Sequence, residues 1–170
     1  MPEGLLLLGL IALQRLSELW LARRHTAALM ARGAVEYGAA HYPLMVAFHA
    51  TWLLGMLALA WDHPVSLPWL GAVLVLQVAR YWIIHTLGER WTTRIIVLAG
   101  APAVTTGPFR LIRHPNYAVV AAEIAAVPLA LGLPVFAAVF FALNLPILAI
   151  RIRAEDKALS WAENPSLAKP

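Results

Sequence analysis

The sequence lacks cysteine and is poor in charged residues. With 0 cysteines among 170 residues, a disulfide framework, a thiolate metal site and a cysteine nucleophile are all excluded. Only 13% of the residues are charged, against about 25% in soluble domains, and an intrinsically disordered chain would need more charge and less apolar content. The sequence also shows no internal repeat, no glycine-rich phosphate loop and no histidine pair at metal-binding spacing, so we expect no metal ligands.

Hydrophobic residues are correspondingly abundant. They make up 61% of the chain, and the mean hydropathy is +0.72. A single domain of this length cannot hide so much apolar surface from water, because a small domain exposes a large share of its chain. The apolar residues are therefore predicted to face lipid, and the protein is predicted to be an integral membrane protein.

Five apolar segments approach the length needed to cross a bilayer, which is about 20 helical residues. The first three are adequate, whereas the last two are short and contain Pro128 and Pro146, which predicts kinked or partly inserted helices. The fold class is therefore predicted to be all-α, a polytopic membrane helix bundle of about five transmembrane helices. The candidate spans are residues 4–21, 41–61, 66–87, 117–131 and 134–150.

Basic residues outside the candidate spans are confined to one side of this five-span arrangement. The positive-inside rule then places the N-terminus outside and the C-terminus in the cytoplasm, as a multi-pass membrane protein. Grouping by loop indicates topology rather than a phosphate-binding face, so no nucleic-acid partner is expected. These residues are Arg23, Arg24, Arg32, Arg90, Arg94, Arg110, Arg113, Arg151, Arg153, Lys157 and Lys169.

Several ionisable residues fall inside the candidate spans, where they are costly and mark a paired or functional interior. Arg15 and Glu18 stand three residues apart, share a helix face and could neutralise each other. A structural buried pair and a functional site are both open interpretations of them. His49 is expected to pack or hydrogen-bond within the bundle rather than bind a metal.

Residues 113–117 lead into the fourth candidate span. Pro115 suits the first turn of a helix, because its missing N–H costs nothing there. His114 and Asn116 would then lie at a helix N-terminus, where unpaired amides and the helix dipole favour an anion such as a carboxylate. Glu123 follows Asn116 by seven residues and is predicted to face the same way, deeper in the bilayer. The alternative is a basic juxtamembrane loop that binds lipid headgroups.

A second polar cluster follows the fifth candidate span. Arg151 and Glu155 are four residues apart on one helix face, a spacing that usually marks a solvated helix end. In the five-span arrangement, however, this cluster emerges on the same side as residues 113–117, from the two helices of one hairpin. We therefore predict that the two clusters lie close together and form one polar site.

These residues resemble the isoprenylcysteine carboxyl methyltransferase family. The string at 113–117, Arg-His-Pro-Asn-Tyr, precedes an intramembrane glutamate, and Arg151 precedes the pair Glu155 and Asp156. The turn at 105–109, Thr-Thr-Gly-Pro-Phe, also fits, and the resemblance covers about residues 87–159. It is closest to the small bacterial branch, some of which methylate lipidic pyrone or phenol hydroxyls. The resemblance implies a single integral membrane methyltransferase domain, 1–170, with a three-helix part, 1–86, and a part that binds S-adenosyl-L-methionine, 87–170.

The resemblance also implies roles for particular residues. Arg151 matches the arginine at the methyl acceptor, and we take Arg151 and Glu123 as the candidate catalytic residues. Phe109 stands where the family often has tyrosine, and residues 101–104 replace a His-x-Leu-Val segment. The implied cofactor-binding residues are Ala101, Pro102, Ala103, Val104, Phe109, His114, Pro115, Asn116, Tyr117 and Glu155.

The acceptor is expected to be a lipidic, prenylated or alkylated small molecule that reaches the site from the surrounding membrane lipids. A carboxylate acceptor is ionised near neutral pH and needs no base, and Arg151 would hold it. A phenol or enol would need deprotonation, in which His114 or Glu123 could assist. Two alternatives are an NADPH-dependent membrane lipid or sterol reductase, whose members share a similar Arg-His-Pro architecture, and a non-enzymatic lipid-binding membrane subunit.

Overall fold

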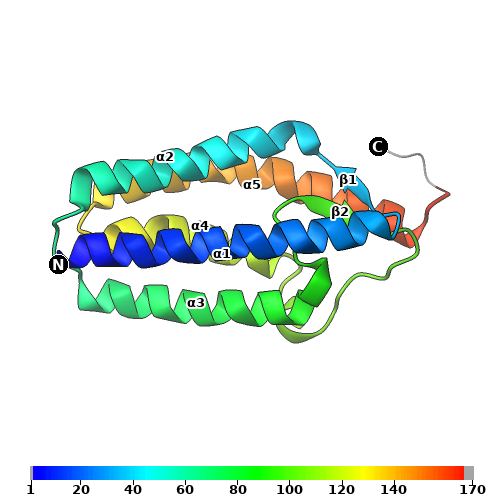
Figure 1. Cartoon of the computed structure of the whole chain (residues 1–170), viewed down its shortest axis with the longest axis horizontal. Helices are drawn as coiled ribbons and strands as arrows, with labels where there is room; N and C mark the ends of the chain where they lie inside the picture. The colour runs from blue at the N-terminus through cyan, green and yellow to red at the C-terminus, as the bar shows by residue number, and fades with distance from the viewer. Residues whose placement is uncertain (1, 167–170) are drawn as a thin grey trace.

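The computed structural model describes residues 2–166 and consists mainly of five helices that run side by side along its long axis (Figure 1). Three short 3-10 helices and two short strands connect them at one end. The long helices are α1 (Glu3–Ala31), α2 (Tyr42–Ala60), α3 (Leu67–Leu87), α4 (Pro115–Ala130) and α5 (Pro134–Glu163). The short elements are β1 (Val35–Tyr37), η1 (Ala39–His41), η2 (Gly88–Arg90), β2 (Ile95–Val97) and η3 (Gly107–Arg110).

This bundle confirms the predicted fold class, with one correction to the helix lengths. α5 has 30 residues and continues beyond Ile150 to Glu163, so the prediction of a short last helix is wrong. Among the described residues, four helices are long and apolar enough to cross a membrane, and α4 is a shorter apolar helix of 16 residues. Lys169, which we assigned to the basic side, lies outside the described residues.

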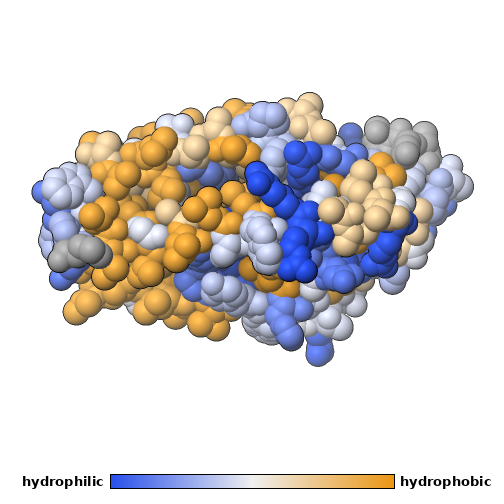
Figure 2. Space-filling model, viewed as in Figure 1, coloured by the Kyte–Doolittle hydropathy of each residue, from blue (hydrophilic) through white to orange (hydrophobic). Residues whose placement is uncertain are grey.

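The outward faces of the helices are apolar along most of the bundle. On α1, for example, Leu10, Leu13 and Leu16 are 58%, 65% and 63% exposed. Figure 2 shows this apolar surface over the part of the bundle away from the strands, whereas hydrophilic residues gather toward the end where β1 and β2 lie in Figure 1. So large a continuous apolar surface is far from what a soluble monomer exposes, and the chain is a membrane protein.

Helix α4 is the most enclosed element, and α2 contacts it through an unusual hydrogen bond. Pro128 lies inside α4 and has no N–H, which leaves the carbonyl of Ile124, four residues earlier, without its helical donor. The indole Nε1 of Trp52 on α2 donates to this carbonyl at 3.2 Å. Trp52 is 3% exposed, so the bond is shielded from water and joins the two helices inside the apolar core.

The loops at one end of the bundle are joined by a small sheet that the sequence reasoning missed. β1 and β2 pair antiparallel, with Val35 opposite Val97, and so connect the segment after α1 to the segment after α3. The amide of Gly100 also donates to the carbonyl of Ala162 at 2.7 Å, which ties the second segment to the end of α5. We call this end, formed by residues 32–41, 88–114 and 151–166, the basic end.

Candidate active site

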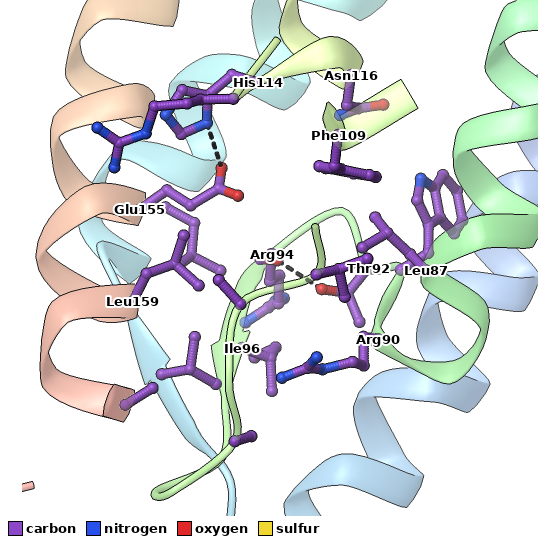
Figure 3. Close-up of a pocket in the computed structure, with 18 of the residues that line it drawn as sticks. Leu87, Arg90, Thr92, Arg94, Ile96, Phe109, His114, Asn116, Glu155 and Leu159 are labelled. Carbon is purple, nitrogen blue, oxygen red and sulfur yellow. Dashed lines mark hydrogen bonds and ion pairs between the residues drawn. The ribbon is translucent and has the colours of Figure 1, made fainter. Parts of the chain in front are cut away.

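A cleft of about 250 Å³ opens at the basic end, between the start of α4, the second half of α5 and segment 90–109. Figure 3 shows Glu155 and Leu159 of α5 along one wall. Phe109 and Asn116 lie on the facing side in the same view. From the helices the cleft is lined by Leu29, Leu87, Pro115, Asn116, Tyr117, Arg151, Glu155, Leu159 and Ala162. From the connecting segments it is lined by Arg90, Trp91, Thr92, Arg94, Ile95, Ile96, Val97, Leu98, Ala101, Ala103, Val104, Thr105, Phe109, Arg113 and His114.

The two predicted polar clusters meet in this cleft. Nδ1 of His114 lies 4.0 Å from Oε2 of Glu155 (Figure 3), and Nε2 of His114 lies 3.1 Å from Oδ1 of Asp156. The prediction that the start of α4 and the end of α5 form one polar site is therefore confirmed. Nδ1 of His114 is buried and has no hydrogen-bond partner among the described residues, so its hydrogen-bonding capacity is unused there.

The start of α4 presents one backbone donor to the same space. As the sequence predicts, Pro115 is the first residue of the helix, and His114 immediately precedes it. Pro115 has no N–H, and the amides of Tyr117 and Ala118 both donate to the His114 carbonyl, so the amide of Asn116 is the first-turn donor left without an acceptor among the described residues. Together with the helix dipole, this amide makes the side of the cleft next to Asn116 favourable for a negatively charged group.

Arg151 is a buried cation on the floor of the cleft. It is 6% exposed, donates from Nη2 to the carbonyl of Thr93 at 3.1 Å, and its guanidinium carbon lies 5.7 Å from the ring centroid of Tyr117. Within residues 2–166 it forms no ion pair with a carboxylate. A buried guanidinium without a directly paired carboxylate is costly, so an anionic group bound beside it would be favoured.

Segment 98–106 lines one side of the cleft; it turns at residues 99–100 and contains no helix or strand. Arg90 donates from Nη2 to the carbonyl of Pro102 at 2.8 Å, which fixes the segment against η2. Among the described residues, the amides of Ala103 and Val104 donate to no backbone carbonyl. These two amides therefore have unused hydrogen-bonding capacity on this side of the cleft.

The structure brings together nearly all of the residues that the sequence singled out. Every predicted cofactor residue except Pro102 lines the cleft, and so does Arg151. The side chains contributed by η2 and β2 were not predicted. Arg90 and Ile96 are examples, and only the pairing of β2 with β1 places them beside the cleft. Their local signal is weak, because a three-residue strand gives almost no periodicity.

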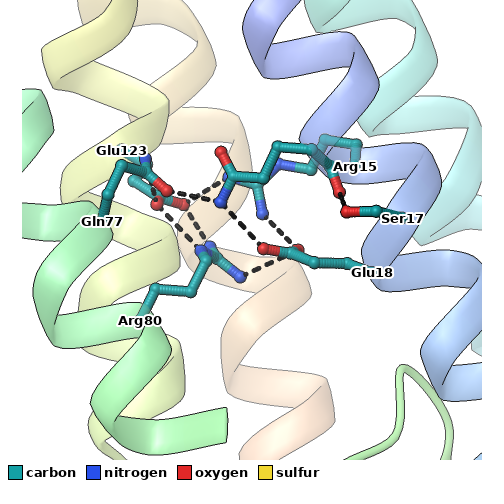
Figure 4. A network of polar contacts seen from close by, with 7 residues as sticks. Arg15, Ser17, Glu18, Gln77, Arg80 and Glu123 are labelled. Carbon is teal, nitrogen blue, oxygen red and sulfur yellow. Dashed lines mark hydrogen bonds and ion pairs between the residues drawn. The ribbon is translucent and has the colours of Figure 1, made fainter.

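Glu123 is not part of the cleft, which corrects its predicted position. Its carboxylate accepts hydrogen bonds from Nε of Arg80 at 2.9 Å, Nη2 of Arg15 at 2.7 Å and Nε2 of Gln77 at 3.0 Å (Figure 4). Nη2 of Arg80 also contacts Oε2 of Glu123. With two arginines already bound to it, Glu123 is not positioned to act on a substrate in the cleft beside Tyr117.

The same network confirms the predicted pairing of Arg15 with Glu18. Nη1 of Arg15 lies 2.8 Å from Oε2 of Glu18, and Arg80 approaches the same oxygen at 3.4 Å. Two positive and two negative charges from α1, α3 and α4 therefore balance inside the bundle, as ionisable groups at membrane depth require. His49 lies apart from these ion pairs and hydrogen-bonds the carbonyl of Met45 at 2.8 Å, as expected for a histidine that packs within the bundle.

Two curated bacterial proteins are similar to this chain over most of its length. The chain is 38% identical over 159 residues to the uncharacterized protein YpbQ of Bacillus subtilis (strain 168), covering 91% of this chain and 95% of that protein. It is 30% identical over 157 residues to an uncharacterized protein of Haemophilus influenzae (strain ATCC 51907 / DSM 11121 / KW20 / Rd), covering 86% of this chain and 88% of that protein. No solved structure matches the chain.

A family model covers the part of the chain that builds the cleft. The model of the isoprenylcysteine carboxyl methyltransferase (ICMT) family matches residues 69–161, which run from α3 through α4 and into the last turns of α5. This range includes His114, Arg151 and Glu155, the residues whose meeting defines the site. The chain therefore belongs to the isoprenylcysteine carboxyl methyltransferase family, whose members are membrane methyltransferases.

Proposed function

We propose that this protein transfers a methyl group from S-adenosyl-L-methionine to an anionic oxygen, a carboxylate or an acidic hydroxyl, of a lipidic acceptor. The observation that carries the proposal is Arg151, a buried arginine without a carboxylate partner among the described residues, in a cleft that also holds Glu155 and His114. Arg151, the cation that we assign to the acceptor, and Glu155, the carboxylate that we assign to the cofactor, therefore face the same cleft.

The residues present fit the cofactor. Glu155 offers carboxylate oxygens that suit ribose hydroxyls, and the unpaired amide of Asn116 in the first turn of α4 suits a carboxylate. The free amides of segment 98–106 and the ring of Phe109 suit an adenine. When bound, S-adenosyl-L-methionine supplies an electrophilic methyl group carried on a positively charged sulfur.

The protein's own contribution is to position the acceptor and to exclude water. The Thr93 carbonyl and the Tyr117 ring fix the Arg151 guanidinium, so its remaining donors have a defined direction toward an acceptor oxygen. A carboxylate needs no further activation. For a hydroxyl acceptor, His114 is the candidate base, because Asp156 contacts one ring nitrogen and the other is buried beside the cleft.

The position of the cleft explains why such an enzyme is built into a membrane. The cleft lies where the apolar bundle meets the basic end, so the reactive oxygen of a lipid can reach Arg151 while its tail stays among the helices. Its volume of about 250 Å³ is also below the roughly 300–1,000 Å³ of typical ligand pockets, which suits one nucleoside better than a dinucleotide such as NADPH.

Calorimetry with S-adenosylhomocysteine on the full chain in detergent tests the cofactor assignment. We expect binding, and we expect Glu155→Gln to weaken it about tenfold or more, since a hydrogen bond to a charged group contributes about 1.5–3 kcal/mol. Glu163→Gln is the matched control, because Glu163 ends the same helix outside the cleft. Absence of binding, equal effects of both variants, or preferential binding of NADPH would contradict the assignment.

Methyl transfer to an added lipid acid tests the acceptor assignment separately. With a confirmed acceptor, Arg151→Gln should raise the acceptor KM at least tenfold and leave the affinity for S-adenosylhomocysteine within about threefold of that of the unmodified protein. An unchanged KM for an anionic acceptor would refute the role of Arg151.

We also propose that the basic end faces the cytoplasm of a bacterial inner membrane, with the start of α1 on the other side. The support is the joining of three basic segments at one end by the β1–β2 pairing and by the bond from Gly100 to Ala162. Because the chain has no cysteine, single cysteines can be introduced without background labelling. In intact cells an impermeant maleimide should label Asp62→Cys and spare Ser160→Cys, and the opposite pattern would refute this orientation.

A further inference from the structure

A second hollow, of about 310 Å³, lies at the basic end on a different face of α5 from the cleft. Ile150, Arg153, Ala154 and Lys157 line it from α5, and these positions follow one face of a helix at intervals of three and four residues. Tyr37 and Gly38, at the end of β1, line the other side. None of these residues belongs to the cleft that holds Arg151.

The two cations of this hollow lack partners in the protein. Arg153 and Lys157 are exposed, and neither forms an ion pair or hydrogen bond with any other residue in the 2–166 range. By contrast, Arg32, Arg94 and Arg113 at the same end all have carboxylate partners. Like charges four residues apart on a helix repel each other, so an anion between them is favoured.

The hollow lies at the level where α5 leaves its apolar stretch. On the same face, Leu143 is 54% exposed and Ile150 is 46% exposed, so the face is apolar up to Ile150 and cationic from Arg153 onward. This order matches the order of chemistry along a phospholipid, in which acyl chains adjoin a phosphate. A free phosphate in water would use the cations alone and would leave the apolar stripe unused.

We propose that this hollow binds the phosphate of an anionic phospholipid, with Arg153 and Lys157 holding the headgroup and an acyl chain lying along Ile150 and Leu143. The site is separate from methyl transfer, and it anchors the second half of α5 at the membrane surface. Because Arg151 and Glu155 lie on the opposite face of the same turns, a lipid bound here fixes the helix that carries them.

The test measures binding of phosphatidylglycerol and phosphatidylcholine to the full chain in neutral detergent, by native mass spectrometry and by the lipid-induced rise in melting temperature. The protein should prefer phosphatidylglycerol. Each basic residue near an anionic headgroup contributes about fivefold in affinity, so Lys157→Gln should cost about fivefold and Arg153→Gln/Lys157→Gln about thirtyfold. Both residues are exposed, and the variants should fold normally.

A matched control removes the same net charge from exposed residues outside the hollow. Arg23→Gln/Arg110→Gln changes two exposed arginines outside the hollow and should leave phosphatidylglycerol binding within about twofold of that of the unmodified protein. Equal losses in both double variants would show that only net charge matters and would overturn the site. Inorganic phosphate at millimolar concentration should not compete, and full competition would overturn the assignment to a lipid.

Discussion

Removing the charge of Glu123 is expected to destabilise the bundle strongly, although Glu123 lies away from the cleft. The Glu123 side chain is 3% exposed and that of Arg80 is 4% exposed, so both charges are shielded from solvent. In the unmodified protein Arg15 and Glu18 complete a neutral set with them. Glu123→Gln leaves one uncompensated positive charge inside the bundle while it keeps the size of the side chain.

The magnitude follows from the contacts that are lost. In the unmodified protein, Nε of Arg80 donates to Oε1 of Glu123 at 2.9 Å. Glutamine retains one oxygen, which can still accept this hydrogen bond. The other oxygen is replaced by an NH2 group, which faces the N–H donors of Arg15 and Arg80 and cannot accept from them. The carboxylate of Glu18, at 3.4 Å, is then the one that remains near Arg80. Breaking a buried ion pair in this way costs about 3–5 kcal/mol. At about 2–4 °C per kcal/mol for a chain of this size, the melting temperature should fall by roughly 6–20 °C.

The assay is thermal unfolding in detergent, followed by tryptophan fluorescence, on a double-mutant cycle of Glu123→Gln and Arg80→Gln. The double variant should be less destabilised than the sum of the single variants by at least about 2 kcal/mol, because removal of both partners restores neutrality. Glu89→Gln is the control: it breaks an exposed pair with Arg32 at 3.3 Å and should cost less than about 0.5 kcal/mol. Strictly additive losses, or a loss below about 1 kcal/mol for Glu123→Gln alone, would refute the reasoning.

Three further predictions concern the packing that supports the site. Trp52→Phe should cost about 1–3 kcal/mol in unfolding free energy, because the buried carbonyl of Ile124 loses the indole donor. Pro128→Ala should recover part of that loss, because it supplies a backbone N–H to the same carbonyl. Gly4→Ala should lower the melting temperature, because its Cβ would overlap the backbone where α2 ends, whereas Gly9→Ala, with no atom within 4 Å of its Cβ, should raise stability by about 0.5–1 kcal/mol. Asn144→Leu should stabilise the protein by about 1–3 kcal/mol, since the amide is 1% exposed and unpartnered within residues 2–166, and a destabilised variant would show that the amide has a partner.

The helix bundle could be predicted from the sequence because each membrane helix is marked by many apolar residues in succession. About 20 apolar residues are needed for each span, and the error of a few residues at each end leaves the arrangement unchanged. The end of α5 was misjudged for a physical reason. Apolarity stops near Ile150, but the helical backbone continues to Glu163, because Tyr37 and Trp161 pack together at a ring-centroid distance of 5.6 Å. Hydropathy marks the edge of the lipid, whereas tertiary packing decides where the helix ends.

The part of the candidate site that consists of consecutive residues or of one helix face could be predicted from the sequence. The part that depends on the pairing of β1 with β2 could not. His114 and Asn116 are adjacent to a proline that begins a helix, and Arg151 and Glu155 are one turn apart. The position of Glu123 was misjudged because a spacing of seven residues fixes a shared helix face but not what covers it. The side chains of Arg15 and Arg80, from two other helices, occupy that face, and no local pattern in α4 reveals them.

The shortness of α4 is what makes room for the cleft. Its 16 residues extend about 24 Å, less than the roughly 30 Å of a bilayer core, whereas the 30 residues of α5 extend about 45 Å. Because Trp52 holds the Ile124 carbonyl in the second half of α4, α4 must begin below the level that α5 reaches at the basic end. Segment 98–114 and the cleft occupy the space between the start of α4 and the level that α5 reaches. Tyr117 and Arg151 therefore come together at the border between the apolar bundle and the basic end. A longer α4 would fill this space with helix, and the lipidic acceptor that we propose would then have no access to the charges at the basic end.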